Sequence, residues 1–194
     1  MEGVGSVEGR TVAPGRDAGD AVALVAAARD GSAAAVEALV RDHWEMAHRA
    51  AFLVTQDAAA AEDVAQEAIL AAVGRLDRFD ARRPFGPWLH RIVVNRAIDW
   101  VRARQRRGEV EPAAAPEPAA PPPAAGLPDD VVAALATLDP EDRAVVVLRH
   151  LLDHDSGEIA RMLGMPPATV RTRLRRALTR LRPLLADRVE GGPS

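Results

Sequence analysis

Residues 156–181 read SGEIARMLGMPPATVRTRLRRALTRL, and this stretch decides the fold class. Ala160 is small at the point where two short helices would cross closely. Gly164 occupies the turn between them, and Val170 would plug the second helix against the first. The spacing indicates a helix-turn-helix, although an ordinary helical hairpin would share the same three residues.

The second helix of this stretch has two chemically different sides. With a turn of about 100° per residue, one stripe is apolar and consists of Val170, Leu174, Ala177, Leu178 and Leu181. The opposite side carries Thr172, Arg175, Arg176 and Thr179, and Arg171 and Arg173 stand on the flanks. A helix that reads DNA needs this division, because exposed donors must reach base edges while flanking cations hold phosphates. No acidic residue interrupts the helix, which favours DNA reading over a purely structural role.

Helical periodicity also dominates the rest of the chain, and no segment reads as a strand. We therefore expect an all-α protein with helices over 20–42, 58–76, 84–106, 128–138, 141–152, 156–163 and 167–185. Asp139 followed by Pro140 marks a helix start, and Asp155 with Glu158 fits a capping box.

A proline-rich segment divides these helices into two groups. Residues 108–126 contain six prolines among alanines and show no periodicity, which is typical of a semi-stiff spacer. We expect two small helical domains joined by this Pro/Ala-rich linker. The expected bounds are a disordered tail over 1–19, a first domain over 20–107, the linker over 108–126, a helix-turn-helix domain over 127–188 and a short tail over 189–194.

Positive charge is concentrated in two places, although the 194-residue chain has a formal net charge of −3. Residues 78–107 hold nine arginines against two aspartates, and residues 161–188 hold eight arginines against one aspartate. Two basic patches on an acidic background predict a protein that touches nucleic acid twice. Two solvated helix faces would show the same charge pattern.

The first basic patch also contains aromatic and amide groups. A stripe of Arg91, Asn95, Asp99 and Arg102 follows one side of the predicted helix 84–106, beside a loop with Phe79, Arg82, Arg83 and Phe85. Such a surface suits single-stranded or melted DNA, whose exposed bases can stack or enter a pocket. The aromatic rings could equally belong to the hydrophobic core.

An acidic and amide cluster precedes this patch. Residues 61–76, AEDVAQEAILAAVGRL, place Glu62, Asp63, Gln66 and Glu67 near the start of an amphipathic helix. Acids there favour the helix dipole, and they would equally suit a partner surface, so both interpretations stay open.

Several other classes of protein are excluded or disfavoured. The chain has no cysteine, which removes disulfides, thiolate metal sites and cysteine nucleophiles. It has neither a membrane-spanning apolar stretch nor a signal peptide, so we expect a cytoplasmic protein without membrane insertion. His150 and His154 lack a third ligand nearby, and no phosphate-cradling glycine loop appears. We therefore expect no metal, no cofactor and no enzymatic activity.

Taken together, four segments resemble the extracytoplasmic function (ECF) sigma factors, the minimal two-domain class of the bacterial sigma-70 family. The segments are AEDVAQEAI at 61–69, FDARRPFGPWLHRIVVNRAID at 79–99, LDPEDRAVVVLRH at 138–150 and SGEIARMLGMPPATVRTRLRRA at 156–177. Their order, their spacing and the linker position agree with that class over residues 20–185.

The resemblance implies a transcription initiation factor that binds RNA polymerase core, through its beta and beta-prime subunits, and promoter DNA. An anti-sigma factor is a further candidate partner. For core binding it implies Glu62, Asp63, Gln66, Glu67 and Leu70. For the minus-ten element it implies Phe79, Asp80, Arg82, Arg83, Phe85, Arg91, Asn95, Asp99 and Arg102. For the minus-thirty-five element it implies Thr169, Arg171, Thr172, Arg175 and Arg176, with Arg173 on phosphate.

Two other functions remain to be separated from this one. A dimeric regulator would use the helix-turn-helix alone, with the first domain sensing a ligand. A helical adaptor would not bind nucleic acid at all, and the salt dependence of DNA binding separates it from both other functions.

Overall fold

The computed structural model describes residues 18–108 and 126–186. Every regular element in these two ranges is helical, as the periodicity predicts. The elements are α1 Ala18–Arg29, α2 Ala33–Thr55, α3 Ala58–Val73, the short 3₁₀ helix η1 Leu76–Arg78, α4 Phe85–Arg106, α5 Asp129–Ala136, α6 Pro140–His150, α7 Ser156–Leu163 and α8 Pro167–Leu184. Most of the predicted tails and linker lies outside the described residues.

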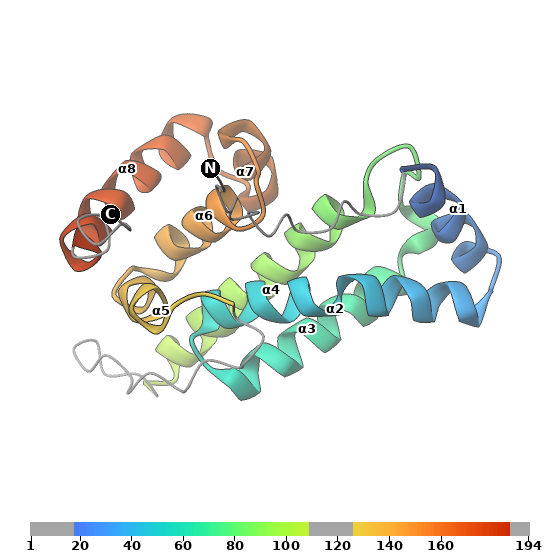
Figure 1. The fold of residues 1–194 in the computed structure, drawn as a ribbon, viewed down its shortest axis with the longest axis horizontal. Helices are drawn as coiled ribbons and strands as arrows, with labels where there is room; N and C mark the ends of the chain where they lie inside the picture. Colours follow the sequence, from blue (N-terminus) through green and yellow to red (C-terminus); the bar gives the residue numbers. More distant parts are fainter. Residues whose placement is uncertain (1–17, 109–125, 187–194) are drawn as a thin grey trace, which may run out of the picture.

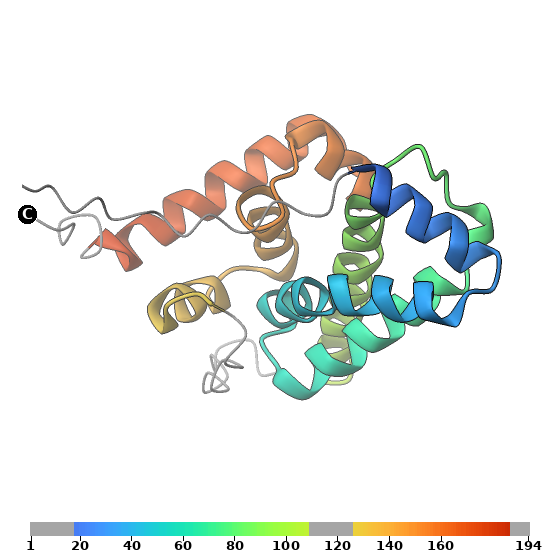
Figure 2. The same cartoon turned by 45° about the vertical axis from the view of Figure 1, so that its right-hand side comes forward.

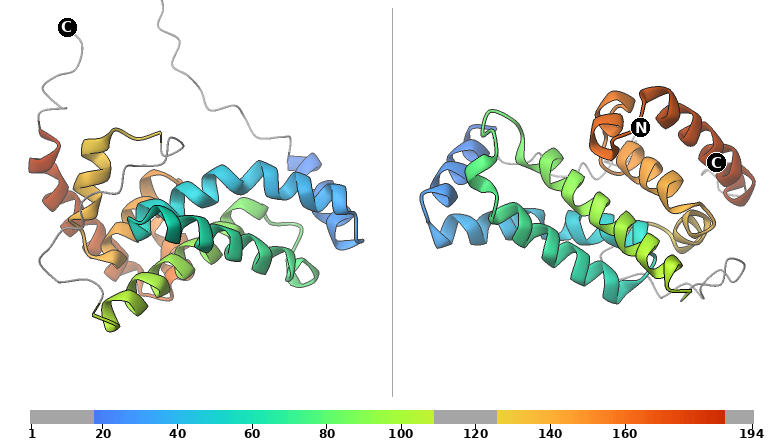
Figure 3. Two further views of the ribbon diagram at one scale, coloured as in Figure 1. Left: turned by 90° about the horizontal axis from the view of Figure 1, so that it is seen from below. Right: turned by 180° about the vertical axis from the view of Figure 1, so that it is seen from behind.

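The helices form two groups that pack against each other. In Figure 1, α2, α3 and α4 run side by side, and α1 packs on α2. The second group, α5 to α8, is separate in the view of Figure 2 and contacts the first group mainly through α6 against α2 and α4. Seen from behind in Figure 3, α4 runs beside α6. No described helix is long and apolar enough to cross a membrane.

Local chemistry sets several helix ends. The predicted capping box is confirmed: the Glu158 amide donates to the Asp155 carboxylate at 2.7 Å, and the Asp155 amide donates to the Glu158 carboxylate at 2.9 Å. Gly164 ends α7 in the left-handed region with φ 65°, which costs glycine little. Gly164 thus lies in the turn between α7 and α8, as the sequence predicts for the helix-turn-helix.

The predicted single helix over 20–42 is wrong. The chain turns at Gly31, where φ is +89°, and Ser32 begins a new helix by accepting a hydrogen bond from the Ala35 amide at 3.3 Å. That second helix continues to Thr55, well past the predicted end. Its last turns are buried on all sides, so no amphipathic periodicity marks them.

A buried arginine at the start of α6 joins the two groups. Arg143 is only 7% exposed, and its guanidinium donates to the carbonyls of Val54 at 2.8 Å, Leu138 at 2.9 Å and Ala136 at 3.2 Å. Val54 lies near the end of α2, whereas Ala136 is the last residue of α5 and Leu138 lies in the connection between α5 and α6. Burial lowers the pKa of Arg143 to about 10, so the side chain is still charged at neutral pH. One side chain thus satisfies carbonyls from both groups of helices.

We predict that Arg143→Met lowers the free energy of unfolding by about 3 kcal/mol, because buried carbonyls lose their donor. Urea denaturation of the full chain, followed by circular dichroism, measures this loss. As the control, Arg41→Met removes an exposed arginine whose ion pair among the described residues is with Glu37 on the same helix. That change should cost less than about 0.5 kcal/mol. Equal losses in the two variants would contradict the structural role of Arg143.

Candidate nucleic-acid interfaces

The first candidate interface consists of α4 and the loop before it. Phe79 and Phe85 are both buried, and their ring centroids lie 5.7 Å apart in an edge-on contact. The half-buried Trp88 packs on them, at 4.7 Å from Phe79 and 5.6 Å from Phe85. These rings therefore pack beneath the loop and support it, and Phe79 and Trp88 also line a cavity that this loop shares with α4 and α7.

Within the loop, Asp80 organises the neighbouring arginines. Its carboxylate accepts hydrogen bonds from the Arg82 side chain at 2.9 and 3.1 Å and from the Arg82 amide at 3.2 Å. Hydrogen bonds from Arg82 also hold the pKa of Asp80 below its ordinary value. Arg83 lies 3.8 Å from the same carboxylate, and both guanidinium groups remain largely exposed. Asp80 thus shapes the loop while the arginines face solvent.

The polar stripe on α4 is assembled as predicted, but parts of it are already engaged. Arg91 is exposed and makes no ion pair within the described residues. Asn95 donates to the carbonyl of Met162 in α7 at 3.0 Å, and Arg102 donates to Glu141 in α6 at 2.8 and 3.0 Å. Asp99 is exposed beside Arg102, at 3.8 Å. Two of the predicted minus-ten contacts therefore bind the second group of helices in this structure.

The second candidate interface is α8. Val170, Ala177 and Leu181 are buried as the stripe predicts, whereas Leu178 is 38% exposed. Arg171, Thr172 and Arg175 are exposed on the helix surface, and Thr169 is half-buried.

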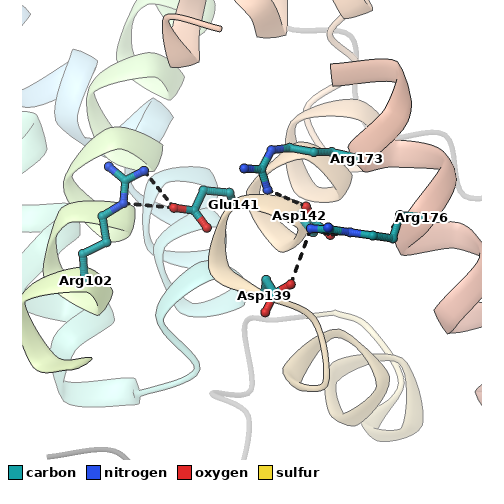
Figure 4. A network of polar contacts seen from close by, with 6 residues as sticks. All are labelled: Arg102, Asp139, Glu141, Asp142, Arg173 and Arg176. Atoms are coloured by element: carbon teal, nitrogen blue, oxygen red, sulfur yellow. Dashed lines mark hydrogen bonds and ion pairs between the residues drawn. The ribbon is translucent and has the colours of Figure 1, made fainter. Parts of the chain in front are cut away.

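Two further arginines of α8, Arg173 and Arg176, bind a carboxylate of α6. Arg173 donates to Asp142 of α6 at 2.7 Å, and Arg176 donates to the same carboxylate at 2.6 Å (Figure 4). Arg176 also lies 3.4 Å from Asp139, and hydrogen bonding to Asp142 raises its pKa. The sequence predicts that these arginines lie on this helix, but it does not predict that Asp142 binds them.

The acidic cluster on α3 is solvent-facing. Glu62, Asp63, Gln66 and Glu67 are all exposed, and Leu70 on the same helix is 65% exposed. Glu67 forms an ion pair with Arg96 of α4 at 2.6 Å. The carboxylates of this surface disfavour contact with DNA phosphates, which carry charge of the same sign.

A histidine pair that the sequence did not reveal lies between the two groups. His90 of α4 and His154, which follows α6, approach at 3.1 Å between Nδ1 and Nε2, and His154 is only 3% exposed. Burial lowers the pKa of His90 from 6.5 to about 3, and the nearby His154 and His43 act in the same direction. Glu158 lies 3.5 Å from the other ring nitrogen of His154. The two histidines are 64 residues apart, so no local pattern could have predicted their contact.

Comparison with known proteins gives the same division of the chain. The model of Sigma-70 region 2 matches residues 39–107, and the model of Sigma-70, region 4 matches residues 129–181. ECF RNA polymerase sigma factor SigM of Mycobacterium tuberculosis is 35% identical over 168 residues, which cover 84% of this chain and 83% of SigM. RNA polymerase sigma-E factor of Streptomyces coelicolor is 33% identical over 154 residues, which cover 78% of this chain and 86% of that protein.

Other similarities differ in coverage. Probable RNA polymerase sigma factor RfaY of Xanthomonas campestris is 34% identical over 150 residues, but the match spans only 38% of RfaY. Among solved structures, CnrH in complex with the cytosolic domain of CnrY superposes with a TM-score of 0.64 at 31% identity, covering 88% of this chain and 99% of CnrH. RpoE from Bartonella quintana, in complex with the anti-sigma factor NepR, has a TM-score of 0.62 at 23% identity and shows the fold alone.

The histidine pair predicts that acid destabilises the protein. Because the folded state keeps His90 neutral down to about pH 3, the unfolded chain binds its proton first, near pH 6.5. Stability is therefore complete above pH 6.5 and falls as the pH drops below it. Between pH 7.5 and 5.5, we expect a loss of about 1 kcal/mol from this residue, measured by urea denaturation.

The matched control separates His90 from the other titrating groups. His90→Gln should flatten the pH dependence, whereas His150→Gln, at an exposed site on α6, should leave it as in the wild type. An unchanged pH dependence in His90→Gln would contradict the assignment.

Proposed function

Because the chain belongs to the sigma-70 family, as an ECF sigma factor, we propose that its two arginine-bearing helices divide promoter recognition between them. An RNA polymerase sigma factor binds core polymerase, directs it to specific promoters and helps to melt DNA for initiation. We assign minus-ten recognition to α4 and its preceding loop, and minus-thirty-five recognition to α8. The corresponding functional units extend over residues 20–107 and 127–188.

One observation carries this division. Within residues 18–108 and 126–186, exposed guanidinium groups without carboxylate partners occur on both helices, among them Arg91 on α4 and Arg171 and Arg175 on α8. Unpaired cations on two separate helices suit contacts with the phosphates and bases of one extended DNA site. The aromatic cluster under the first loop supports that loop while Arg82 and Arg83 face outward, which suits a strand that leaves the duplex.

The exposed face of α3 is the proposed docking surface for core polymerase. It combines Asp63, Gln66 and the exposed Leu70, and it borders the α4 surface, since Asp63 and Arg91 line the same groove. An apolar side chain that is rimmed by polar ones matches the anatomy of a protein interface. Glu67 contributes through its ion pair with Arg96, which fixes α3 against α4.

Three further properties follow from this role. Sigma factors regulate transcription and are not catalysts, so we propose that the chain has no enzymatic activity and needs no cofactor. We place it in the cytoplasm, where RNA polymerase acts. An anti-sigma factor is a proposed additional partner, by analogy with RpoE, whose solved complex contains the anti-sigma factor NepR.

In vitro transcription tests the proposed function directly. The template is a pool of random duplexes placed upstream of a barcoded transcribed region, because no promoter needs to be assumed. Bacterial core polymerase is added with and without the full chain, and the transcripts are sequenced. We expect transcripts that depend on the chain and that share two separated sequence blocks. Transcription that is identical with and without the chain would contradict the function.

The same experiment separates the competing functions. A dimeric regulator would bind DNA through a single repeated block and would need no core polymerase. A helical adaptor would enrich no sequence.

We predict that Asp63→Arg and Leu70→Asp each weaken the binding of the chain to core polymerase at least tenfold, as measured by fluorescence anisotropy. The first change reverses a charge, and the second places a charge on an apolar contact, which a buried interface tolerates poorly. Helical content should stay unchanged because both side chains are exposed.

Val22→Asp is the matched control. Val22 is an apolar residue on α1 that is 45% exposed, and it lies away from α3. Its replacement should leave the affinity for core polymerase intact. Equal weakening by Val22→Asp and Leu70→Asp would contradict the assignment of α3.

A further inference from the structure

Asp142 is a nearly buried carboxylate that binds two arginines of α8 at once. The residue is 2% exposed, and each of its oxygens accepts one hydrogen bond, from Arg173 Nη1 at 2.7 Å and from Arg176 Nε at 2.6 Å (Figure 4). Arginines three residues apart lie on the same side of a helix, so one carboxylate on α6 can hold both. A carboxylate is buried only where such partners compensate its charge.

The two bound arginines are not equivalent to the rest of α8. Arg173 is the more buried of the pair, and its ion pair in the part of the chain that the structure describes is with Asp142; its buried Nε atom has no hydrogen-bond partner there. By contrast, Arg171 and Arg175 are exposed and have no ion pair within the described residues. The four arginines over residues 171–176 are thus divided into a pair that is held by Asp142 and a pair without an ion pair among the described residues.

We infer that Asp142 is a positioning residue for promoter recognition: it holds Arg173 and Arg176 on α6 and thereby sets the rotation of α8 that presents Arg171, Thr172 and Arg175 to DNA. The inference rests on the function proposed above. It changes the assignment made from the sequence, in which Arg173 contacts phosphate and Arg176 reads a base.

Asp142 competes with DNA phosphates for Arg173 and Arg176, and this competition favours the state in which both arginines stay bound to Asp142. A phosphate that captured either arginine would have to compete with a carboxylate that is already in place and only about 2.7 Å away. Loss of an arginine would also leave the buried charge of Asp142 less compensated, which adds to the cost of the exchange. Exposed arginines such as Arg175 carry no such cost.

The main test is Asp142→Asn, with Asp139→Asn as the matched control. Asp139 is an exposed carboxylate whose ion pair among the described residues is with Arg176, at 3.4 Å. The probe is a duplex library with a 12-base-pair random window, selected by the full chain assembled with core polymerase. Affinity for the most enriched duplex and for a scrambled duplex is then measured at several salt concentrations.

In the wild type, we expect a clear preference for the enriched duplex. Asp142→Asn should reduce that preference at least tenfold. It should also steepen the slope of log affinity against log salt by about one to two units, because freed arginines become available to phosphates. Asp139→Asn should change neither quantity. An unchanged preference and slope in Asp142→Asn would overturn the inference.

Replacement of the arginines tests the inference even if Asp142→Asn fails to fold. Arg173→Gln and Arg176→Gln should reduce sequence preference and leave the salt slope unchanged, since neither side chain contacts phosphate. A slope that falls by about one unit in either variant would overturn the inference, because that is the signature of a lost phosphate contact. Arg175→Ala is the contrasting variant and should relax preference at one base pair.

A readout without DNA separates this inference from the proposed function. In the free chain, the Arg176 Nε–H bond to Asp142 should slow its exchange with solvent in nuclear magnetic resonance spectra. Arg176→Gln assigns the signal, because it removes the Nε–H resonance altogether. Asp142→Asn should remove the slow exchange of that resonance. Fast exchange in the wild type would overturn the role of Asp142 even if the chain directs transcription. Slow exchange without any selected DNA sequence would instead contradict the proposed function.

Discussion

The first turn of α6 carries three consecutive charged residues, and each is bound to a different part of the molecule. Glu141 accepts from Arg102 of α4, Asp142 accepts from two arginines of α8, and Arg143 donates to the end of α2. Successive residues on a helix point about 100° apart, so one turn can address three neighbours. A charge that leaves water needs a partner, and these partners fix where α4, α8 and α2 lie around α6.

The contacts between the two groups of helices also engage side chains of α4 that are predicted to contact DNA. Asn95 uses both hydrogens of its amide nitrogen, one on the carbonyl of Arg91 and one on that of Met162. A DNA base that accepts a hydrogen bond from this amide nitrogen must therefore displace one of these carbonyls. Arg102 likewise uses Nε and Nη2 on Glu141, so a DNA contact through those two atoms requires this ion pair to open. The described packing of the two groups of helices thus occupies donor atoms of two side chains that are predicted to contact DNA.

Local chemistry could be predicted from the sequence, and the long-range polar pairs could not. The capping box of Asp155, the left-handed Gly164 and the apolar side of α8 depend only on neighbours within a few residues. The end of α2 escaped prediction because its last turns are buried on every side and lose their period. Contacts such as Arg173 with Asp142 or His90 with His154 join residues 31 and 64 positions apart, and only the packed fold brings them together.

Ion pairs within the fold also mean that the number of arginines in a patch overstates its attraction for DNA. Many arginines of the two basic patches have carboxylate partners in the fold, namely Arg82, Arg96, Arg102, Arg104, Arg173 and Arg176. A guanidinium held by a carboxylate adds little net field toward DNA, because the two charges form a dipole that fades faster with distance than a single charge. Among the described residues, the effective footprint is therefore carried by the exposed arginines without an ion pair, which are Arg91 and Arg106 on α4, Arg161 on α7, and Arg171, Arg175, Arg180 and Arg182 on α8. The paired ones position the helices, so a patch of arginines serves both to build the fold and to contact DNA.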